Sequence, residues 1–327
     1  MTVKITQPAR NLREELNELR TPTGIAGEAM LRADTPQEQF NLIGAGRKNL
    51  IINGAMQVWQ RGTSFSGFNG YTADHIQMQS QFADITVERV QDAVGLYHLK
   101  ATKTGSSLFN NIVFPVENGR NLLAGKKLTF SCWVRCNIDS TIEFNFRRSS
   151  AGVGGGDLVT DGIASAQVTK PVSTEWAYYT HTTEVPSNYE ATDVNLIAQI
   201  GFYGIGSGNY IEIKEVQLEL GKVATPFEHR SYGEELALCQ RYYEVIDQWW
   251  ASGYGDGTSA QNNTVHMAVA KRATPTLTYA VGGASTNAGT PIVFAVSGNS
   301  IYQAQNASSA AGYSRFHFDD ITIDAEL

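Results

Sequence analysis

The residues of this 327-residue chain that could do catalytic chemistry are scattered rather than gathered in recognisable motifs. No G-x-S-x-G elbow, H-E-x-x-H helix or Cys-x-x-Cys pair is present. The six histidines stand singly, without the spacing of metal ligands. A glycine-rich run at 152–156 lacks both the lysine of a phosphate-binding loop and a helix after it. We therefore expect no enzymatic activity, no zinc site and no catalytic residue.

Carboxylates offer two weaker possibilities. Glu212, Glu215 and Glu219 could be mistaken for the acid and base of a glycosidase, but their alternation with apolar residues favours a solvated sheet face. Four aspartates could supply oxygen ligands to a structural calcium ion, although their spacing is not that of an EF-hand: Asp74, Asp84, Asp157 and Asp256. We expect no cofactor and leave a structural calcium open.

An aromatic cluster is the best candidate for binding. Sugar rings present apolar faces that stack on Trp and Tyr, while amide and carboxylate groups take their hydroxyls. The cluster and its polar neighbours suit such contacts: Trp249, Trp250, Tyr254, Asp256, Asn262 and Asn263. The alternative is that the tryptophans belong to a core or a subunit interface. Of the other tryptophans, Trp59 and Trp176 fit the core, and Trp133 lies in the outward phase of its strand.

Composition excludes several other classes. The net charge of −7 gives no broad positive field, so we expect no nucleic-acid binding. No segment resembles a signal peptide or approaches 18 apolar residues, so we expect no membrane insertion. Cys132 and Cys136 stand four apart on one strand, roughly 13 Å at about 3.3 Å per residue, too far for a disulfide. We read these two and Cys239 as buried thiols of a protein made in a reducing cytoplasm.

Residues 1–48 differ from the rest. A helix over 9–20 places Leu12, Leu16 and Leu19 in one stripe, and a capping box before Pro36 starts a second helix over 36–43. A helix of about three turns with one apolar stripe is marginal alone in water. It either folds back on its own chain or docks on another protein or on sister subunits.

The remaining chain is mainly β. Between residues 49 and 227 the apolar period is two, as in 128–136 and 142–146, which predicts an antiparallel jelly-roll β-sandwich. In the last strand of this stretch the inward phase slips at Lys214-Glu215, as a β-bulge would allow. A capping box at Ser231 then opens a helix over 232–246, which places Leu236, Cys239, Tyr243 and Ile246 on one side. Short strands follow at 265–270, 276–279, 292–294 and 314–323.

Three segments carry a resemblance to a known family. These are Asn49-Leu-Ile-Ile-Asn-Gly-Ala-Met-Gln-Val-Trp-Gln-Arg-Gly62, Tyr71-Thr-Ala-Asp74, and the stretch from Ile211 through Ala224-Thr-Pro-Phe-Glu228 to Tyr243. They resemble the modular tail-fibre and receptor-binding proteins of tailed bacteriophages. That resemblance implies a carbohydrate-binding-like jelly roll, a C-terminal tip, a homotrimer and a location in the virion tail after assembly in the bacterial cytoplasm. It transfers no binding residue, because receptor sites in that family are diverse.

The sequence thus predicts a smaller β-rich domain, opened by one helix, after the sandwich, and a short helical segment before it. We divide the chain into an anchor at 1–48, a sandwich at 49–228 and a tip at 229–327. The expected function is that of a non-enzymatic phage tail fibre. It attaches to a tail or baseplate protein by its N-terminus and recognises a host polysaccharide or lipopolysaccharide. A structural connector without receptor binding and a carbohydrate-active tailspike enzyme remain alternatives.

Overall fold

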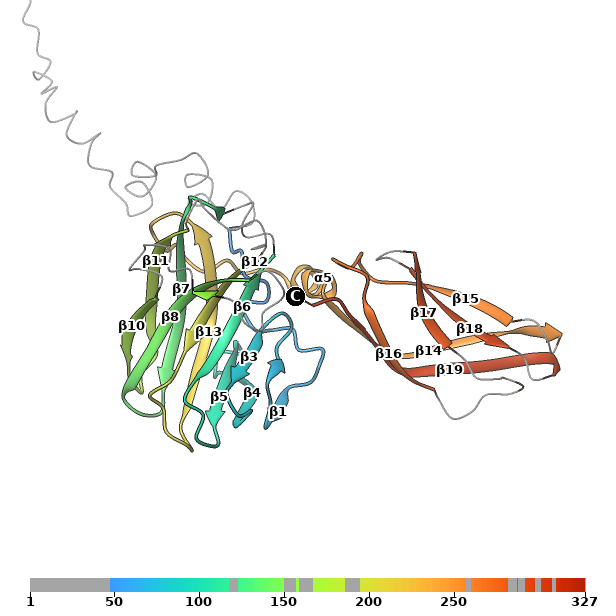
Figure 1. Ribbon diagram of the computed structural model, residues 1–327, viewed down its shortest axis with the longest axis horizontal. Coiled ribbons are helices and arrows are strands. Elements are labelled where there is room, and N and C mark those ends of the chain that lie inside the picture. The colour runs from blue at the N-terminus through green and yellow to red at the C-terminus, as the bar shows by residue number, and fades with distance from the viewer. Residues whose placement is uncertain are drawn as a thin grey trace, which may run out of the picture.

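The computed structural model of the chain shows a large β-sandwich joined to a smaller, elongated β-rich region (Figure 1). It describes residues 48–117, 123–149, 157–158, 167–185, 195–256, 260–281, 287, 292–297, 301–307 and 310–326. The predicted helices over 9–20 and 36–43, with Leu12, Leu16 and Leu19, lie outside the described residues. No helix of the described part is long and apolar enough to span a membrane.

Two antiparallel sheets form the sandwich. One has the strand order β1-β4-β5-β13-β7-β11 and the other β10-β8-β12-β6-β3-β2, with β9 paired to β8. Their strands are β1 (Ser64–Ser66), β2 (Gly70–Tyr71), β3 (Gln77–Ser80), β4 (Ile85–Gln91), β5 (Tyr97–Lys103), β6 (Asn110–Val116), β7 (Lys127–Cys136), β8 (Ser140–Ser149), β9 (Asp157–Leu158), β10 (Gln167–Val172), β11 (Ala177–Glu184), β12 (Asn195–Gly201) and β13 (Tyr210–Leu220). The predicted jelly-roll sandwich is confirmed.

The alternation read from the sequence places the core correctly. In β7 and β8 the even-numbered apolar residues, such as Phe130 and Phe144, are fully buried between the sheets. Phe130 contacts Phe114, Phe144 and Phe146 edge-on, with ring centroids 5.3 to 6.0 Å apart. All three cysteines are free and buried, as predicted, and Trp59 lies in this core.

The predicted β-bulge in β13 is also confirmed. The register with β7 shifts between Lys214 and Gln217, and Glu215 has a φ of 51°. This one-residue slip lets Ile213 before it and Val216 after it both reach the core. The strand therefore crosses the sandwich without turning apolar side chains to water.

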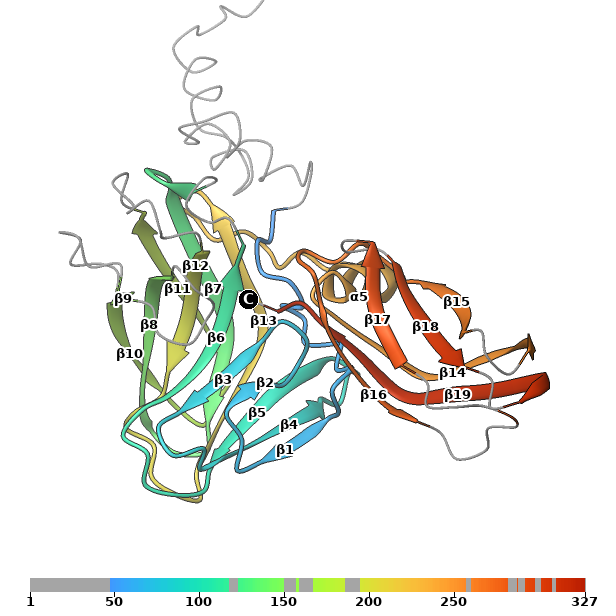
Figure 2. The same cartoon turned by 45° about the vertical axis from the view of Figure 1, so that its right-hand side comes forward.

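The described residues of the C-terminal region form one helix and two three-stranded sheets, ordered β14-β19-β16 and β15-β18-β17. In both views one sheet lies over the other, and β14 and β19 run away from the sandwich (Figures 1 and 2). A separate small core forms around Phe316, Phe318 and Ile321. The elements are α5 (Tyr232–Gln240), β14 (Tyr243–Asp256), β15 (Ala260–His266), β16 (Thr276–Val281), β17 (Ile292–Ser297), β18 (Ile301–Ala307) and β19 (Ala311–Asp324).

The helix after Ser231 is shorter than predicted. Ser231 caps it as expected, with Oγ accepting from the N–H of Glu234, and Cys239 is buried on its inner side. It ends at Gln240, however, and Tyr243 to Ile246 belong to β14, where they pair with the end of β19. The apolar spacing fitted a helix. These residues pair with β19 instead of extending the helix, because the aromatic and β-branched residues at 243–246 suit a pleated sheet equally well.

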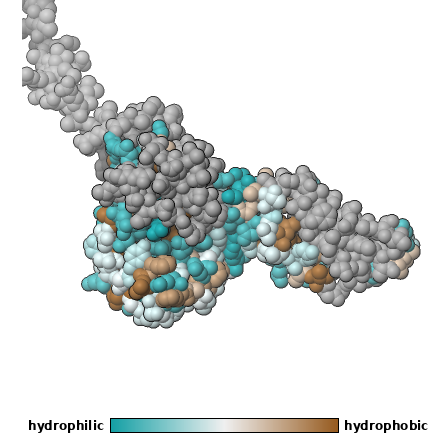
Figure 3. Space-filling view, in the orientation of Figure 1, coloured by the Kyte–Doolittle hydropathy of each residue, from teal (hydrophilic) through white to brown (hydrophobic). Residues whose placement is uncertain are grey.

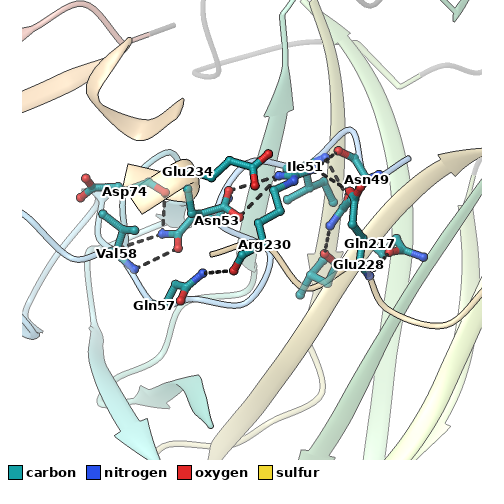
Figure 4. A network of polar contacts seen from close by, with 12 residues as sticks. Asn49, Ile51, Asn53, Gln57, Val58, Asp74, Gln217, Glu228, Arg230 and Glu234 are labelled. Atoms are coloured by element: carbon teal, nitrogen blue, oxygen red, sulfur yellow. Dashed lines mark hydrogen bonds and ion pairs between the residues drawn. The ribbon is translucent and has the colours of Figure 1, made fainter. Parts of the chain in front are cut away.

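A buried polar network joins the sandwich to α5 (Figure 4). Arg230 donates to the carbonyl oxygens of Asn49 and Ile51, and it pairs with Glu228 at 2.9 Å and Glu235 at 3.2 Å. Glu235 in turn accepts from the backbone N–H of Asn53 at 2.5 Å. We call this contact region between the sandwich and α5 the joint. Its residues come from the segments 49–62 and 211–243 that carry the resemblance.

The chain end reinforces the same joint. Glu326 pairs with Arg61 at 3.2 Å and with His75 at 2.9 Å, and the C-terminal residues lie against the sandwich (Figure 2). The guanidinium of Arg61 also covers the ring of Tyr243, with 3.4 Å between Cζ and the ring centroid. Tyr242 donates its hydroxyl proton to Glu117 of the sandwich at 2.8 Å. The surface near the junction is mainly hydrophilic in the space-filling view (Figure 3).

Gly54 tests how tightly this joint is packed. A Cβ at residue 54 would lie 2.1 Å from the carbonyl oxygen of Val216, so Gly54→Ala must displace backbone. We expect it to lower the free energy of unfolding by about 1–3 kcal/mol. Gly233→Ala is the matched control, because a Cβ there meets nothing within 4 Å and alanine favours the helix. Thermal unfolding followed by circular dichroism measures both, and equal stability of the two variants would contradict the packing described.

Candidate functional site

The strand pair β14–β19 changes which of its faces is buried halfway along. Ile246 packs into the small core, but beyond Asp247 the inward positions are Trp249 and its partner Phe318. The switch lies beside Asp320, which has a φ of 50° and adjoins a register shift against β16. Trp249 therefore stacks on Phe318, with ring centroids 6.0 Å apart, whereas its neighbour Trp250 faces solvent. The predicted cluster is split between the two faces of one sheet.

Trp250 is held in a closed set of contacts. Its indole N–H donates to Oε1 of Gln248 at 2.7 Å, and Gln248 donates to Asp319 at 2.9 Å. Asp319 also pairs with His317 at 3.3 Å, and the imidazole stacks on Trp250 with ring centroids 4.0 Å apart. These contacts fix the orientation of the indole before any ligand arrives.

Arg315 covers the same indole. Its Cζ lies 3.8 Å from the centroid of the Trp250 ring, and the side chain is exposed. An imidazole and a guanidinium cannot both lie about 4 Å from one ring centroid on the same side without overlapping, so the indole is sandwiched between His317 and Arg315. Trp250 therefore presents mainly its edge to solvent, and one face of its ring supports the guanidinium through a cation–π contact.

Tyr254 and Tyr313 complete the outward face. They are direct cross-strand partners and expose 82% and 55% of their surface, compared with 40% for Trp250. Asp256 is exposed on β14 beyond Tyr254. We call this surface, made of Trp250, Tyr254, Tyr313, Arg315 and His317, the distal aromatic face. Of the other predicted site residues, Trp249 points from the opposite face of this sheet into the small core. Asn262 and Asn263 lie on β15, and their side chains are outside the described set.

The distal aromatic face could not be assembled from one segment of sequence. Trp250 and Tyr254 were recognisable as a local cluster, but Tyr313, Arg315 and His317 come from a strand near the chain end. The period-two pattern of 314–323 predicted that strand without indicating its partner. Only the β14–β19 register brings the two halves together.

A concave surface lies on the outer face of the seven-stranded sheet, apart from the distal aromatic face. This hollow has a volume of about 600 Å³ and is lined by Asn69, Gln77, Gln79, Ser80, Gln81, Phe109, Asn111, Arg147 and Tyr203. Tyr203 donates to Asn111 Oδ1 at 2.9 Å, and burial is the main cause that raises the pKa of its phenol. Amide groups beside aromatic rings suit polyhydroxylated ligands. No local pattern in the sequence indicates this hollow, because its lining residues come from separate strands.

The two remaining tryptophans lie on the six-stranded sheet. Trp133 faces outward, as predicted, and packs against Tyr178 with ring centroids 5.4 Å apart. Together with residues 224–227 they line an apolar hollow of about 570 Å³. The expectation that Trp176 belongs to the core is wrong. It is half-buried between the cations of Arg135 and Lys214, each within 5 Å of its ring centroid.

The expectation of a solvated glutamate face is also wrong. Glu219 is fully buried, because the turn at Thr225 folds over it and donates its N–H and hydroxyl at 2.8 and 2.7 Å. Glu212 is buried between Arg135 and His98, and Glu215 is half-buried at the bulge. Alternation in β13 was read correctly, but it could not show that a later segment covers the outer face.

The four aspartates considered for calcium lie apart. Asp74 is buried and accepts from the backbone N–H of Gln60 at 2.9 Å, and burial is the main cause that raises the pKa of its carboxyl. Asp84 accepts from Ser80 at 2.9 Å and from the backbone of Ser107 at 2.7 Å. The side chain of Asp157 is outside the described set, and Asp256 is exposed on β14 beyond Tyr254. Within the described ranges, no three His, Cys, Asp or Glu side chains gather as a metal site requires.

Comparisons with known proteins give distant likenesses. No family model and no curated protein matches the sequence. Similar solved structures include a putative sugar-binding protein from Bacteroides thetaiotaomicron, 15% identical with a TM-score of 0.37, covering 53% of this chain and 100% of that one. The enzymatically active domain of tailspike protein 4 of bacteriophage CBA120 is 16% identical with a TM-score of 0.36, covering 53% and 21%. A family 11 carbohydrate-binding module from Clostridium thermocellum is 12% identical with a TM-score of 0.32, covering 50% and 97%. Likenesses at this level assign neither a ligand nor a family to the chain.

The contacts of Glu212 with His98 and Arg135 predict that the protein loses part of its folding stability in acid. Burial opposes ionisation of Glu212, but hydrogen bonds from His98 and Arg135 outweigh it, so the pKa of this carboxyl lies below its ordinary value of 4.5. A depressed carboxyl pKa contributes stability above the unfolded-state value, and that contribution is lost as pH falls below it. We expect Glu212→Gln to flatten the dependence of unfolding free energy on pH between about pH 5 and pH 3. Glu88→Gln, which removes an exposed pair with Lys100, is the control. An unchanged slope for Glu212→Gln in urea unfolding would refute the assignment.

Proposed function

We propose that this protein is a non-enzymatic tail-fibre protein of a tailed bacteriophage that recognises a host surface glycan through its C-terminal region. The observation that carries glycan recognition is the distal aromatic face. Two exposed tyrosines and a fixed indole stand on a stiff strand pair, beside a guanidinium and amide groups. Exposed rings of this kind stack on the apolar faces of sugars and lose little conformational entropy on binding.

The position of this face supports a role in recognition. It occupies the half of β14 and β19 that is remote from the joint (Figures 1 and 2). The joint itself fixes the base of both strands, through Tyr243 at the start of β14 and Glu326 just after β19. A face held at the end of a rigid arm reaches a cell surface with little loss of orientation.

The resemblance of residues 49–62, 71–74 and 211–243 to phage tail fibres supports the rest of the proposal. On this proposal the fibre is a homotrimer in the virion tail, attached to a tail or baseplate protein through residues 1–48. Each site needs only weak affinity. Several sites acting on one cell surface raise avidity by about 10²–10⁴.

The hollow on the sandwich is the second place where a glycan could bind. Its amide-rich lining and the ring of Tyr203 favour it independently of the distal aromatic face. The two sites make opposite predictions for point variants, so one experiment separates them.

Adsorption of the labelled full-length protein to host cells tests the proposal. We expect Tyr254→Ala and Tyr313→Ala each to weaken binding about two- to tenfold per site, because a stacking contact contributes about 0.5–1.5 kcal/mol. Tyr232→Ala is the matched control, since Tyr232 is 55% exposed like Tyr313 but lies on α5. If only Tyr203→Ala weakens adsorption, recognition lies on the sandwich. Lack of saturable adsorption by the folded wild-type protein would favour a structural connector.

Deletion of residues 1–20 tests the anchor. We expect particles assembled with the shortened chain to lack it, because the stripe of Leu12, Leu16 and Leu19 is removed, while adsorption of the purified protein is unchanged. A triple Leu→Ser variant at these positions should behave in the same way. Normal incorporation into particles, measured by immunoblotting, would exclude residues 1–20 as the attachment segment.

A further inference from the structure

The distal aromatic face carries a cation, Arg315, that forms no ion pair with the described residues. Arg315 is exposed, and among the described residues its recorded contact is with the indole of Trp250. The acidic group closest along the strand, Asp319, is already engaged by His317 and Gln248. The guanidinium donors of Arg315 are therefore available at the surface.

The strand register places Arg315 at the centre of the aromatic face. Arg315 pairs directly with Ser252, so Trp250 and Tyr254 flank it diagonally on β14, and Tyr313 and His317 flank it along β19. Ser252 has a small, exposed side chain directly across from Arg315. An arginine in this position meets any ligand that stacks on the two tyrosines.

From this arrangement we propose that the distal aromatic face binds an acidic sugar, with Arg315 pairing with its carboxylate while Tyr254 and Tyr313 stack on its ring. This inference rests on the proposed glycan recognition and specifies the class of glycan. A guanidinium presents parallel N–H donors that match a carboxylate in bidentate geometry. Its stacking on Trp250 reduces the entropy lost when those hydrogen bonds form.

The charges around Arg315 favour a carboxylate over a phosphate. The described face offers this one guanidinium, while Asp256 and Asp319 bring negative charge to its two ends. A singly charged carboxylate is matched by one guanidinium, whereas a phosphate monoester, with about −1.5 to −2 charges, is repelled by the flanking aspartates. We therefore assign the ligand to sugars of the uronic-acid type.

The test compares one polysaccharide in two chemical forms. Surface polysaccharide extracted from cells that adsorb the protein is used native and after its carboxyl groups are reduced to alcohols. We expect the full-length wild-type protein to bind the native form roughly tenfold or more tightly, as hydrogen bonds to charged groups allow. This preference should shrink as salt rises from about 0.05 to 0.5 M, because an exposed ion pair is screened.

Variants separate the role of Arg315 from that of the rings. Arg315→Gln should bind both forms as the wild type binds the reduced form, so that the preference falls to about one. Trp250→Ala should also lower the preference, because the guanidinium of Arg315 loses the ring on which it stacks. Arg89→Gln is the matched control, since Arg89 lies 4.7 Å from the ring centroid of Tyr97 on the sandwich. It should keep the full preference.

The outcomes distinguish failure of this inference from failure of the proposed function. Equal binding of native and reduced polysaccharide by the wild type, or an undiminished preference in Arg315→Gln, overturns the acidic-sugar assignment and leaves glycan recognition standing. Absence of binding to either form overturns both. Thermal unfolding followed by far-ultraviolet circular dichroism checks that each variant is folded, which we expect because Arg315 and Trp250 are both exposed.

Discussion

The buried guanidinium of Arg230 is the interaction on which the architecture depends. It lies between Glu228 and Glu235 and donates to the backbone of the segment that precedes β1, at Asn49 and Ile51. Burying such charges is costly unless each finds partners, so the three segments that supply the partners must come together as a unit. The start of the sandwich, the turn after β13 and the start of α5 are thus fixed relative to one another.

The same logic extends along the joint. Arg61, His75 and Glu326 link the sandwich to the end of the chain, and Tyr243 sits beneath the guanidinium of Arg61. The last strand, β19, is held at its base by these contacts and in its middle by the small core around Phe318. Loss of the joint would therefore change the position of the distal aromatic face, although that face does not contact Arg230.

The proposed binding surface arises from a change of buried face within the strand pair β14–β19. Up to Ile246 the even-numbered residues of β14 point inward, and from Trp249 the odd-numbered residues do. Without this switch at Asp320, Trp250, Tyr254 and Arg315 would point into the core. A positive φ at a non-glycine residue costs energy, and such strain is found where surrounding structure over-determines it, often near functional sites.

The sequence by itself determined the elements whose pattern is local. Alternation in β7 and β8, the bulge in β13, the cap at Ser231 and the free buried thiols followed from period, turn chemistry and strand length. Tertiary structure decided what covers each face and which strands pair. It buried Glu219 beneath a later turn, ended α5 at Gln240, placed the half-buried Trp176 outside the core and joined Arg315 to Trp250. The physical reason is that local periodicity records only which side of an element is apolar. The partner of that side is set by contacts between residues far apart in the chain, such as Trp250 with His317.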